Sequence, residues 1–167
     1  MNLIVYGTKY GSAEKCVDKL LGALKDPTDV CNIQKMSGID LGKYDTVIIG
    51  GSIYMGNIQK EIKTFCSQNL EVLKSKKIAL FICCMQTGEN AYKQLENAYP
   101  KELIEVAKDK KVFGGEINTK KLGFFDRFIT KMVSKASNSG LPSLDKEGKA
   151  SLILHDNIEH LASAVNS

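Results

Sequence analysis

The strongest constraint on the fold is a regular alternation of short apolar runs with segments of helical periodicity. The apolar runs are strand-sized, rich in Val and Ile, and bounded by turn residues. We expect strands at residues 3–7, 30–33, 46–50, 77–84 and 112–117. The run at 77–84 is nearly continuously apolar, which is typical of a strand buried on both faces at the centre of a parallel sheet.

Between these runs, apolar residues recur at the spacing of one helical face. In residues 12–25 that face carries Cys16, Val17, Leu20, Leu21 and Leu24. Further helices are expected up to about Leu73, from Gly88 to about Lys108 with an interruption at Tyr99-Pro100, and at 157–165. This order predicts an α/β open sheet of five parallel strands with helices on both faces, in one domain over residues 1–167.

The segment from about 118 to 149, before the last helix, interrupts the alternation as an inserted amphipathic stretch. Its apolar residues fall at helical spacing: Leu122, Phe124, Phe125, Phe128, Ile129, Met132 and Val133. Basic residues surround them: Lys120, Lys121, Arg127, Lys131 and Lys135. Two interpretations stay open: a helix packed on the domain edge, or a basic face over 120–135 that contacts a membrane surface, a quinone or a partner.

Composition narrows the class of protein. With 167 residues, of which 43% are hydrophobic and 25% charged, the chain is globular in composition, which excludes disordered, collagen-like and coiled-coil proteins. No stretch approaches the roughly 20 apolar residues of a membrane-spanning helix. Because Met1-Asn2 leads directly into the first strand, we expect a cytoplasmic protein, with a peripheral position at the inner face of the membrane as a second option.

Cysteines and charge argue against two classes of site. The five cysteines are irregularly spaced without a CxxC pair, so we expect buried, reduced thiols, and only His155 and His160 could add imidazole ligands to a metal site. The net charge is +4, and Arg127 is the only arginine among 23 basic residues. Because the lysines are spread along the chain, we expect no nucleic-acid partner.

Three loops lie where the strands of such a sheet end, which is where open α/β sheets bind ligands. The first, 7–12, offers the hydroxyls of Thr8 and Ser12 and a helix start that favours an anion. The second, 50–57, combines glycines with Tyr54, a ring suited to stacking. The third, 84–90, is polar. Together they predict a site for a phosphate and a ring system. Taken alone, the first loop is equally explained by a helix cap at Ser12, and Tyr54 by a packed surface aromatic.

These segments resemble the flavodoxins. Residues 3–12 are similar to the flavodoxin signature, an apolar strand that ends in a T-x-x-G-x-T-type phosphate loop. Residues 44–56 resemble the YD-x-V-I-I-G-x-S-I-x-x-G segment of the branch that contains menaquinone-dependent protoporphyrinogen dehydrogenases. Residues 114–116, followed by 124–132, resemble that branch's segment around D-R-F. The resemblance covers most of the chain.

The resemblance implies a flavodoxin-like sheet of order 2-1-3-4-5 that binds FMN non-covalently. The matching positions would cradle the phosphate, line the isoalloxazine ring and close its other side: Thr8, Lys9, Tyr10, Gly11 and Ser12; Ser52, Ile53, Tyr54, Met55 and Gly56; and Met85, Gln86 and Thr87. Gly56 is expected near the flavin N5 edge, where a peptide could reorient on reduction. Ala13 departs from the signature, which usually has a hydroxyl there.

Three functions follow, and no acid–base catalytic residue is assigned because the flavin carries the electron chemistry. The leading hypothesis is an FMN redox protein that passes electrons between a reductant and a partner protein or a small acceptor. The first alternative is a quinone-linked protoporphyrinogen oxidase or dehydrogenase, although the longer insertion of that branch after the fourth strand is missing here. The second is a binding module that kept the fold without the cofactor.

Overall fold

The structure is a computed structural model that describes residues 1–36, 38–118, 120, 123 and 145–167. Its centre is a five-stranded parallel sheet, and the strand order β2-β1-β3-β4-β5 confirms the predicted topology. The strands are β1 (Asn2–Gly7), β2 (Thr28–Asn32), β3 (Thr46–Ser52), β4 (Lys77–Cys83) and β5 (Asp109–Val112). Strands β1, β3 and β4 are inner strands, which explains why their apolar runs are the least interrupted in the sequence.

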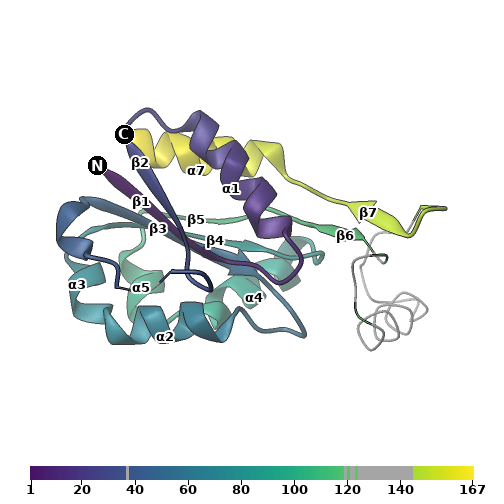
Figure 1. Ribbon diagram of the computed structural model, residues 1–167, viewed down its shortest axis with the longest axis horizontal. Helices are drawn as coiled ribbons and strands as arrows, with labels where there is room; N and C mark the ends of the chain where they lie inside the picture. Colours follow the sequence, from purple (N-terminus) through teal and green to yellow (C-terminus); the bar gives the residue numbers. More distant parts are fainter. Residues whose placement is uncertain (37, 119, 121–122, 124–144) are drawn as a thin grey trace.

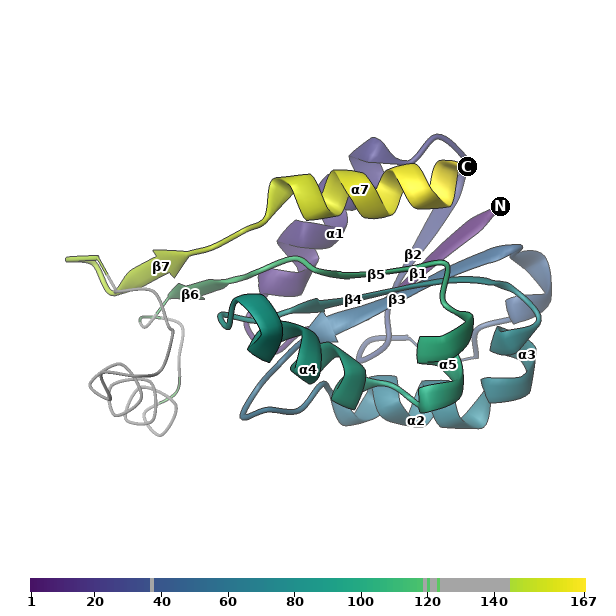
Figure 2. The same ribbon diagram turned by 180° about the vertical axis from the view of Figure 1, so that it is seen from behind.

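Helices cover both faces of the sheet (Figures 1 and 2). On one face lie α1 (Ser12–Ala23) and α7 (His155–Asn166), whose apolar stripes pack on Ile4, Ile48 and Phe81. On the other face lie α2 (Lys60–Gln68), α3 (Leu70–Lys74), α4 (Gly88–Ala98) and α5 (Lys101–Val106), packed around a second apolar cluster. A 3-10 turn, η1 (Leu41–Lys43), precedes β3. The two-faced core follows directly from inner strands that are apolar at nearly every position.

Two predicted helices are divided where the sequence carries a break. The helix expected up to Leu73 changes direction at Asn69, whose side-chain amide donates to the Phe65 carbonyl at 2.9 Å and so bonds the end of α2. The interruption at Tyr99-Pro100 is confirmed, and α5 begins directly after the proline. All five cysteines are buried free thiols, as expected for cysteines that serve as small apolar residues.

The predicted fifth strand, 112–117, is wrong in its position. The sheet strand β5 ends at Val112, and residues from Glu116 onward form β6 (Glu116–Asn118), which pairs with β7 (Lys149–Ser151) in a separate antiparallel ribbon. The cause is Gly114, whose φ of +71° turns the chain out of the sheet direction. The apolar pattern runs across this turn without showing it.

The ribbon β6–β7 extends beyond the end of the parallel sheet (Figures 1 and 2). Its strands are the two ends of the inserted segment, since Asn118 pairs with Lys149 and Glu116 with Ser151. The segment therefore leaves the sheet and returns to α7 at one place. The amphipathic stripe predicted within it, including the 120–135 contact, lies almost entirely outside the described residues.

Candidate functional site

The carboxyl ends of β1, β3 and β4 meet at one edge of the sheet, beside the start of β6. A hollow of about 130 Å³ opens there. Its lining residues come from four separate segments: Lys9, Tyr10 and Ser12; Ser52, Ile53 and Tyr54; Cys83, Cys84 and Met85; and Gly115, Glu116, Ile117 and Asn118. The topology thus brings the three predicted loops to one place, together with a fourth.

The first loop forms an anion-binding start to helix α1. Gly11 is the N-cap at φ +86°, and a Cβ added to it would meet nothing within 4 Å, so the backbone there is open. The first helical hydrogen bond runs from the Lys15 amide to the Gly11 carbonyl at 3.3 Å. The amides of the first turn, beginning with Ser12, therefore have no partner within the helix. The Thr8 hydroxyl accepts the Gly11 amide at 3.0 Å and shapes the loop from inside.

Side chains join the first loop to its neighbours. The Lys9 amide donates to Ser52 Oγ at 3.3 Å, and the Thr8 amide donates to Gln34 Oε1 at 2.9 Å. Gln59 Nε2 donates to both the carbonyl and Oγ of Ser52, each at 2.8 Å. A Cβ at Gly51 would lie 2.5 Å from Gln59 Oε1, so glycine is needed there to admit this side chain. Ser52 is consequently held by two segments of the chain.

The second loop ends in a two-residue turn. The amide of Tyr54 donates to the Asn57 carbonyl at 2.8 Å, and the amide of Asn57 donates back at 3.0 Å. Met55 and Gly56 both have positive φ, +48° and +76°, as a type I′ turn requires. Lys9 Nζ stands 3.3 Å from the centroid of the Tyr54 ring, a cation–π contact that covers one face of the ring. A planar ligand therefore contacts Tyr54 through its other face or displaces Lys9.

The end of β4 and the start of the third loop form the third wall of the hollow, with the thiols of Cys83 and Cys84 and the thioether of Met85. Burial raises the pKa of the Cys84 thiol to about 11. The hydrogen bond shared with Cys16, together with burial, raises the pKa of the Cys83 thiol. Both groups are therefore neutral near pH 7 and make this wall polarisable and apolar.

The fourth wall, from Gly115 to Asn118, was missed by sequence reasoning. Because β5 is parallel to β1, β3 and β4, its carboxyl end reaches the same edge of the sheet. The residues that follow the fifth strand could therefore have been predicted at the site by the same rule as the other three loops. Glu116 forms an ion pair with Lys15 of α1, which fixes β6 against the helix that starts at the first loop. The ammonium group of Lys15 thereby balances the charge of the Glu116 carboxylate, which lines the same hollow as Ser12.

The predicted site residues divide into two groups. Seven line the hollow: Lys9, Tyr10, Ser12, Ser52, Ile53, Tyr54 and Met85. The others lie in the same three loops without lining it: Thr8, Gly11, Met55, Gly56, Gln86 and Thr87. Met55 is 64% exposed, at the tip of the Tyr54–Asn57 turn. The roles assigned to these residues toward a cofactor stay predictions.

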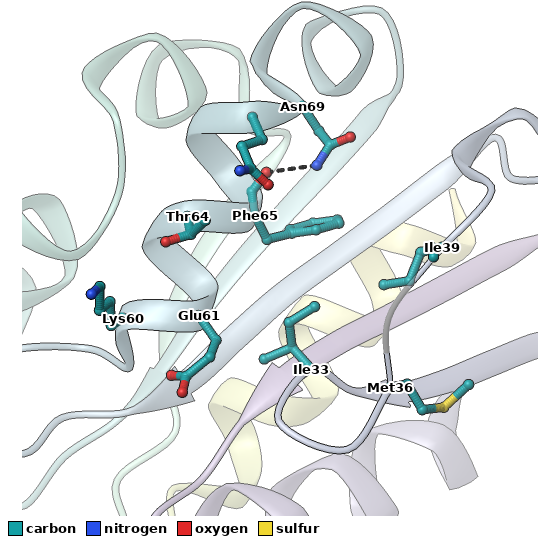
Figure 3. A pocket seen from close by; sticks show the side chains of 10 residues that line it. Ile33, Met36, Ile39, Lys60, Glu61, Thr64, Phe65 and Asn69 are labelled. Atoms are coloured by element: carbon teal, nitrogen blue, oxygen red, sulfur yellow. Dashed lines mark hydrogen bonds between the residues drawn. The ribbon is translucent and has the colours of Figure 1, made fainter.

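A larger groove of about 480 Å³ runs between α2 and the segment that follows β2 (Figure 3). Its floor is apolar, with Ile33, Met36, Ile39 and Phe65, and Figure 3 shows Lys60 and Glu61 at one end of it. The groove is not lined by the start of a helix with a phosphate-type loop, as the hollow beside residues 7–12 is. Within the described ranges, no group of His, Cys, Asp or Glu is arranged to hold a metal ion.

The sequence matches the family model described as flavodoxin domain over residues 3–140. The chain belongs to the flavodoxin domain family. This agrees with the phosphate-type loop, the strand order and the site at the carboxyl edge of the sheet. No curated protein matches the sequence.

Solved flavodoxin structures share the fold. The two-electron reduced flavodoxin of Megasphaera elsdenii superposes with a TM-score of 0.54 at 14% identity, over 98% of this chain and 99% of that one. The Flv1 flavodiiron core of Synechocystis sp. PCC6803 gives 0.52 at 12% identity, over 99% of this chain. This flavodoxin-domain chain corresponds to only 34% of the Synechocystis protein. At these identities the likeness shows the fold alone.

No helix in the described part of the chain is long and apolar enough to cross a membrane.

Proposed function

We propose that this flavodoxin-domain protein binds FMN non-covalently at the carboxyl edge of its sheet and passes electrons between a reductant and a partner protein or small acceptor. The observation that carries the proposal is the convergence of the Ser12 helix start, the Tyr54 turn and the Met85 wall on one hollow. Flavodoxins, which the first loop resembles, use this edge for FMN.

The first loop fits a phosphate. The amides of the first turn of α1 have no partner within the helix, the helix dipole favours a negative group, and the Ser12 hydroxyl adds a donor. The open space above Gly11 leaves the backbone accessible to a ligand. Ala13 supplies an amide but no hydroxyl, so this loop offers one hydroxyl donor fewer than the family signature.

The remaining walls fit one edge of a flat ring. Tyr54 offers an aromatic face, while Met85 and the neutral Cys84 thiol add a water-excluding lining to the same hollow. The hollow of about 130 Å³ is smaller than the roughly 300–1,000 Å³ pockets that enclose whole ligands, so a bound flavin would keep part of its surface exposed. An exposed edge suits electron transfer between proteins.

When bound, FMN supplies the one- and two-electron chemistry. The residues of the chain bind and orient it. Ser52, fixed by Gln59 and by the Lys9 amide, holds the ring loop at a set distance from the phosphate loop. The Lys9 ammonium places positive charge beside the ring site, which favours a more negative, reduced ligand.

A flavin titration tests the proposal. The fluorescence of FMN should fall as protein is added, and the change should saturate at one equivalent. Anaerobic reduction should then bleach the flavin absorbance of the complex reversibly. Riboflavin, which lacks the phosphate, is the matched ligand control and should bind more weakly. A protein that takes up no FMN at micromolar concentration would contradict the proposal and favour the cofactor-free binding module.

A narrower function, quinone-linked oxidation of protoporphyrinogen, is favoured by one observation. The turn around Tyr54 begins within the segment 44–56, which resembles the protoporphyrinogen dehydrogenase branch. The second segment of that resemblance, 124–132, lies outside the described residues. Complementation of a strain that lacks this oxidation tests it: growth without added haem supports the narrower function, and failure by a well-expressed, FMN-loaded protein contradicts it.

A further inference from the structure

We propose that Gln59 is a positioning residue of the flavin site, which fixes Ser52 so that the Ser52 hydroxyl donates its proton to an acceptor atom on the bound ring. This inference rests on the proposed function, because it concerns a contact made by the ligand of the same hollow. It goes beyond that function in two respects. It gives a role to a residue that does not line the hollow, and it sets the direction of one hydrogen bond to the ring.

The Ser52 hydroxyl receives hydrogen bonds from two sides. Gln59 Nε2 donates to Ser52 Oγ at 2.8 Å, and the backbone amide of Lys9 donates to the same oxygen at 3.3 Å. A serine hydroxyl has two acceptor positions and one proton to donate. Both acceptor positions are therefore occupied, and within the described part of the chain Ser52 donates its proton to no other residue.

The orientation of the Gln59 amide follows from its second bond. Gln59 Nε2 also lies 2.8 Å from the backbone carbonyl oxygen of Ser52, which can only accept a hydrogen bond. The atom that faces this carbonyl must therefore be the nitrogen, which donates its other hydrogen to Ser52 Oγ. Gln59 Oε1, the other end of the amide, is buried and has no partner among the residues that the structure describes. The Ser52 proton is thus received by neither end of Gln59.

Two paired glycines make the space in which the Gln59 side chain lies. Gly7 at the end of β1 pairs with Gly51 in β3. A Cβ at Gly51 would lie 2.5 Å from Gln59 Oε1, and a Cβ at Gly7 would lie 3.2 Å from Gln59 Cγ. Side chains at these two positions would crowd Gln59 away from Ser52. The neighbouring strands are therefore built to admit this glutamine.

Helix α2 does not explain why residue 59 is a glutamine. Gln59 is the N-cap of α2, a position at which Ser, Thr, Asp and Asn stabilise a helix through their side chains. The Gln59 side chain makes no capping hydrogen bond and reaches back to Ser52 instead. Only its backbone carbonyl serves the helix, by accepting the amides of Ile62 and Lys63. The length of the glutamine side chain therefore serves the contact with Ser52.

The chemistry of the ligand contact follows from this arrangement. Ser52 is 8% exposed and lines the hollow of about 130 Å³, so the hollow is where its proton finds an acceptor. An isoalloxazine ring carries carbonyl oxygens and ring nitrogens that accept hydrogen bonds. A ligand that presents a donor to Ser52 meets no acceptor position, which leaves both groups unpaired. The pair Gln59–Ser52 thereby selects the orientation in which a ring acceptor faces Ser52.

Flavin titrations of matched variants test the proposal. Ser52→Ala removes the donor and should weaken FMN and riboflavin binding by the same factor, about three- to tenfold, because both ligands share the ring. Gln59→Met keeps the length of the side chain without its donors and should weaken both flavins about two- to fivefold. Because Gln59 acts through Ser52, the double variant should bind no more weakly than Ser52→Ala alone.

The matched control and a spectroscopic signature separate positioning from loss of stability. Gln68→Met makes the same change at the last residue of α2, where the side chain is exposed, and should leave both affinities unchanged within about 1.5-fold. In infrared difference spectra of bound FMN, the ring band that Ser52→Ala shifts should shift in the same direction in Gln59→Met. It should stay in place in Gln68→Met.

Three results would each overturn the proposal: unchanged flavin affinity in Ser52→Ala, additive losses in the double variant, or a ring band that Gln59→Met leaves in place. If circular dichroism shows that Gln59→Met does not fold, Gly51→Ala takes its place, since the added Cβ displaces Gln59 without removing it. Absent FMN uptake by the unmodified protein would contradict the proposed function and this inference with it. A protein that binds FMN and is indifferent to Ser52→Ala contradicts this inference alone.

Discussion

Replacing Gly114 by alanine should destabilise the protein strongly, because Gly114 is where the chain leaves the sheet to build the fourth wall of the site. A Cβ at this position would lie 1.6 Å from the Leu152 carbonyl oxygen, a backbone atom that cannot move alone. The backbone at Gly114 also has φ +71°, a region that alanine adopts only at a cost.

The size of the effect follows from these two contacts. The left-handed backbone costs alanine about 1–2 kcal/mol. Moving the Leu152 carbonyl away breaks its hydrogen bond from the Gly115 amide at 3.2 Å and strains the reciprocal bond at 2.8 Å, each worth about 0.5–1.5 kcal/mol. With the remaining overpacking, we expect Gly114→Ala to lower the free energy of unfolding by about 3–5 kcal/mol.

Urea unfolding followed by far-ultraviolet circular dichroism measures this loss as a fall in the midpoint at a constant slope. Gly115→Ala is the control, since its Cβ would meet Met85 Sδ at 3.5 Å and backbone atoms of Cys84 beyond that, which are ordinary contacts. We expect Gly115→Ala to cost less than about 1 kcal/mol. Equal losses in the two variants would refute the reasoning that the Leu152 carbonyl and the backbone of Gly114 set the cost.

Three further changes test the site. Ser12→Ala should weaken FMN binding by about 1–2 kcal/mol and riboflavin binding by less, measured by fluorescence titration; equal losses would place the phosphate elsewhere. Tyr54→Ala should weaken FMN binding about tenfold and raise the midpoint potential, since stacking contributes about 0.5–1.5 kcal/mol beyond burial; an unchanged absorbance band, affinity and potential would separate Tyr54 from the flavin. Met55→Asn should stabilise the protein by up to about 1 kcal/mol in urea unfolding, because asparagine tolerates the φ of +48°, and a lower midpoint would contradict this.

Much of the fold could be predicted because its elements are locally consistent. Inner strands such as β4 are apolar at nearly every position, and α1 carries a single apolar stripe, so both patterns point to the observed structure. Helix boundaries followed from identifiable breaks, such as Pro100. The site loops were found because parallel strands must end at one edge, which is a property of the topology rather than of any one residue.

Contacts between side chains from different loops could not be predicted in this way. The Lys9–Tyr54 contact joins residues far apart in the sequence, and Gln59 bonds back to Ser52 across the turn between them. Nothing in the local sequence patterns specifies these contacts. The resemblance assigns Thr8 and Gly11 to the phosphate, which stays a prediction, and the structure adds a bond that the sequence did not predict, from the Gly11 amide to the Thr8 hydroxyl, which shapes the loop. A residue type that suits a ligand also suits the loop that presents it.

The one misplaced strand and the one missed wall have the same cause. Residues 112–117 read as a single strand because apolar residues flank the two glycines, but the φ of +71° at Gly114 divides the stretch into β5 and β6. That turn sends Gly115 and Glu116 to the site edge, where they line the hollow together with Ser12 and Met85. The Lys15–Glu116 ion pair then fixes the wall to the helix of the first loop. A glycine that breaks a strand pattern at the carboxyl edge of a parallel sheet is therefore a signal for the site itself, because the residue that ends regular pairing is also the one that positions the wall.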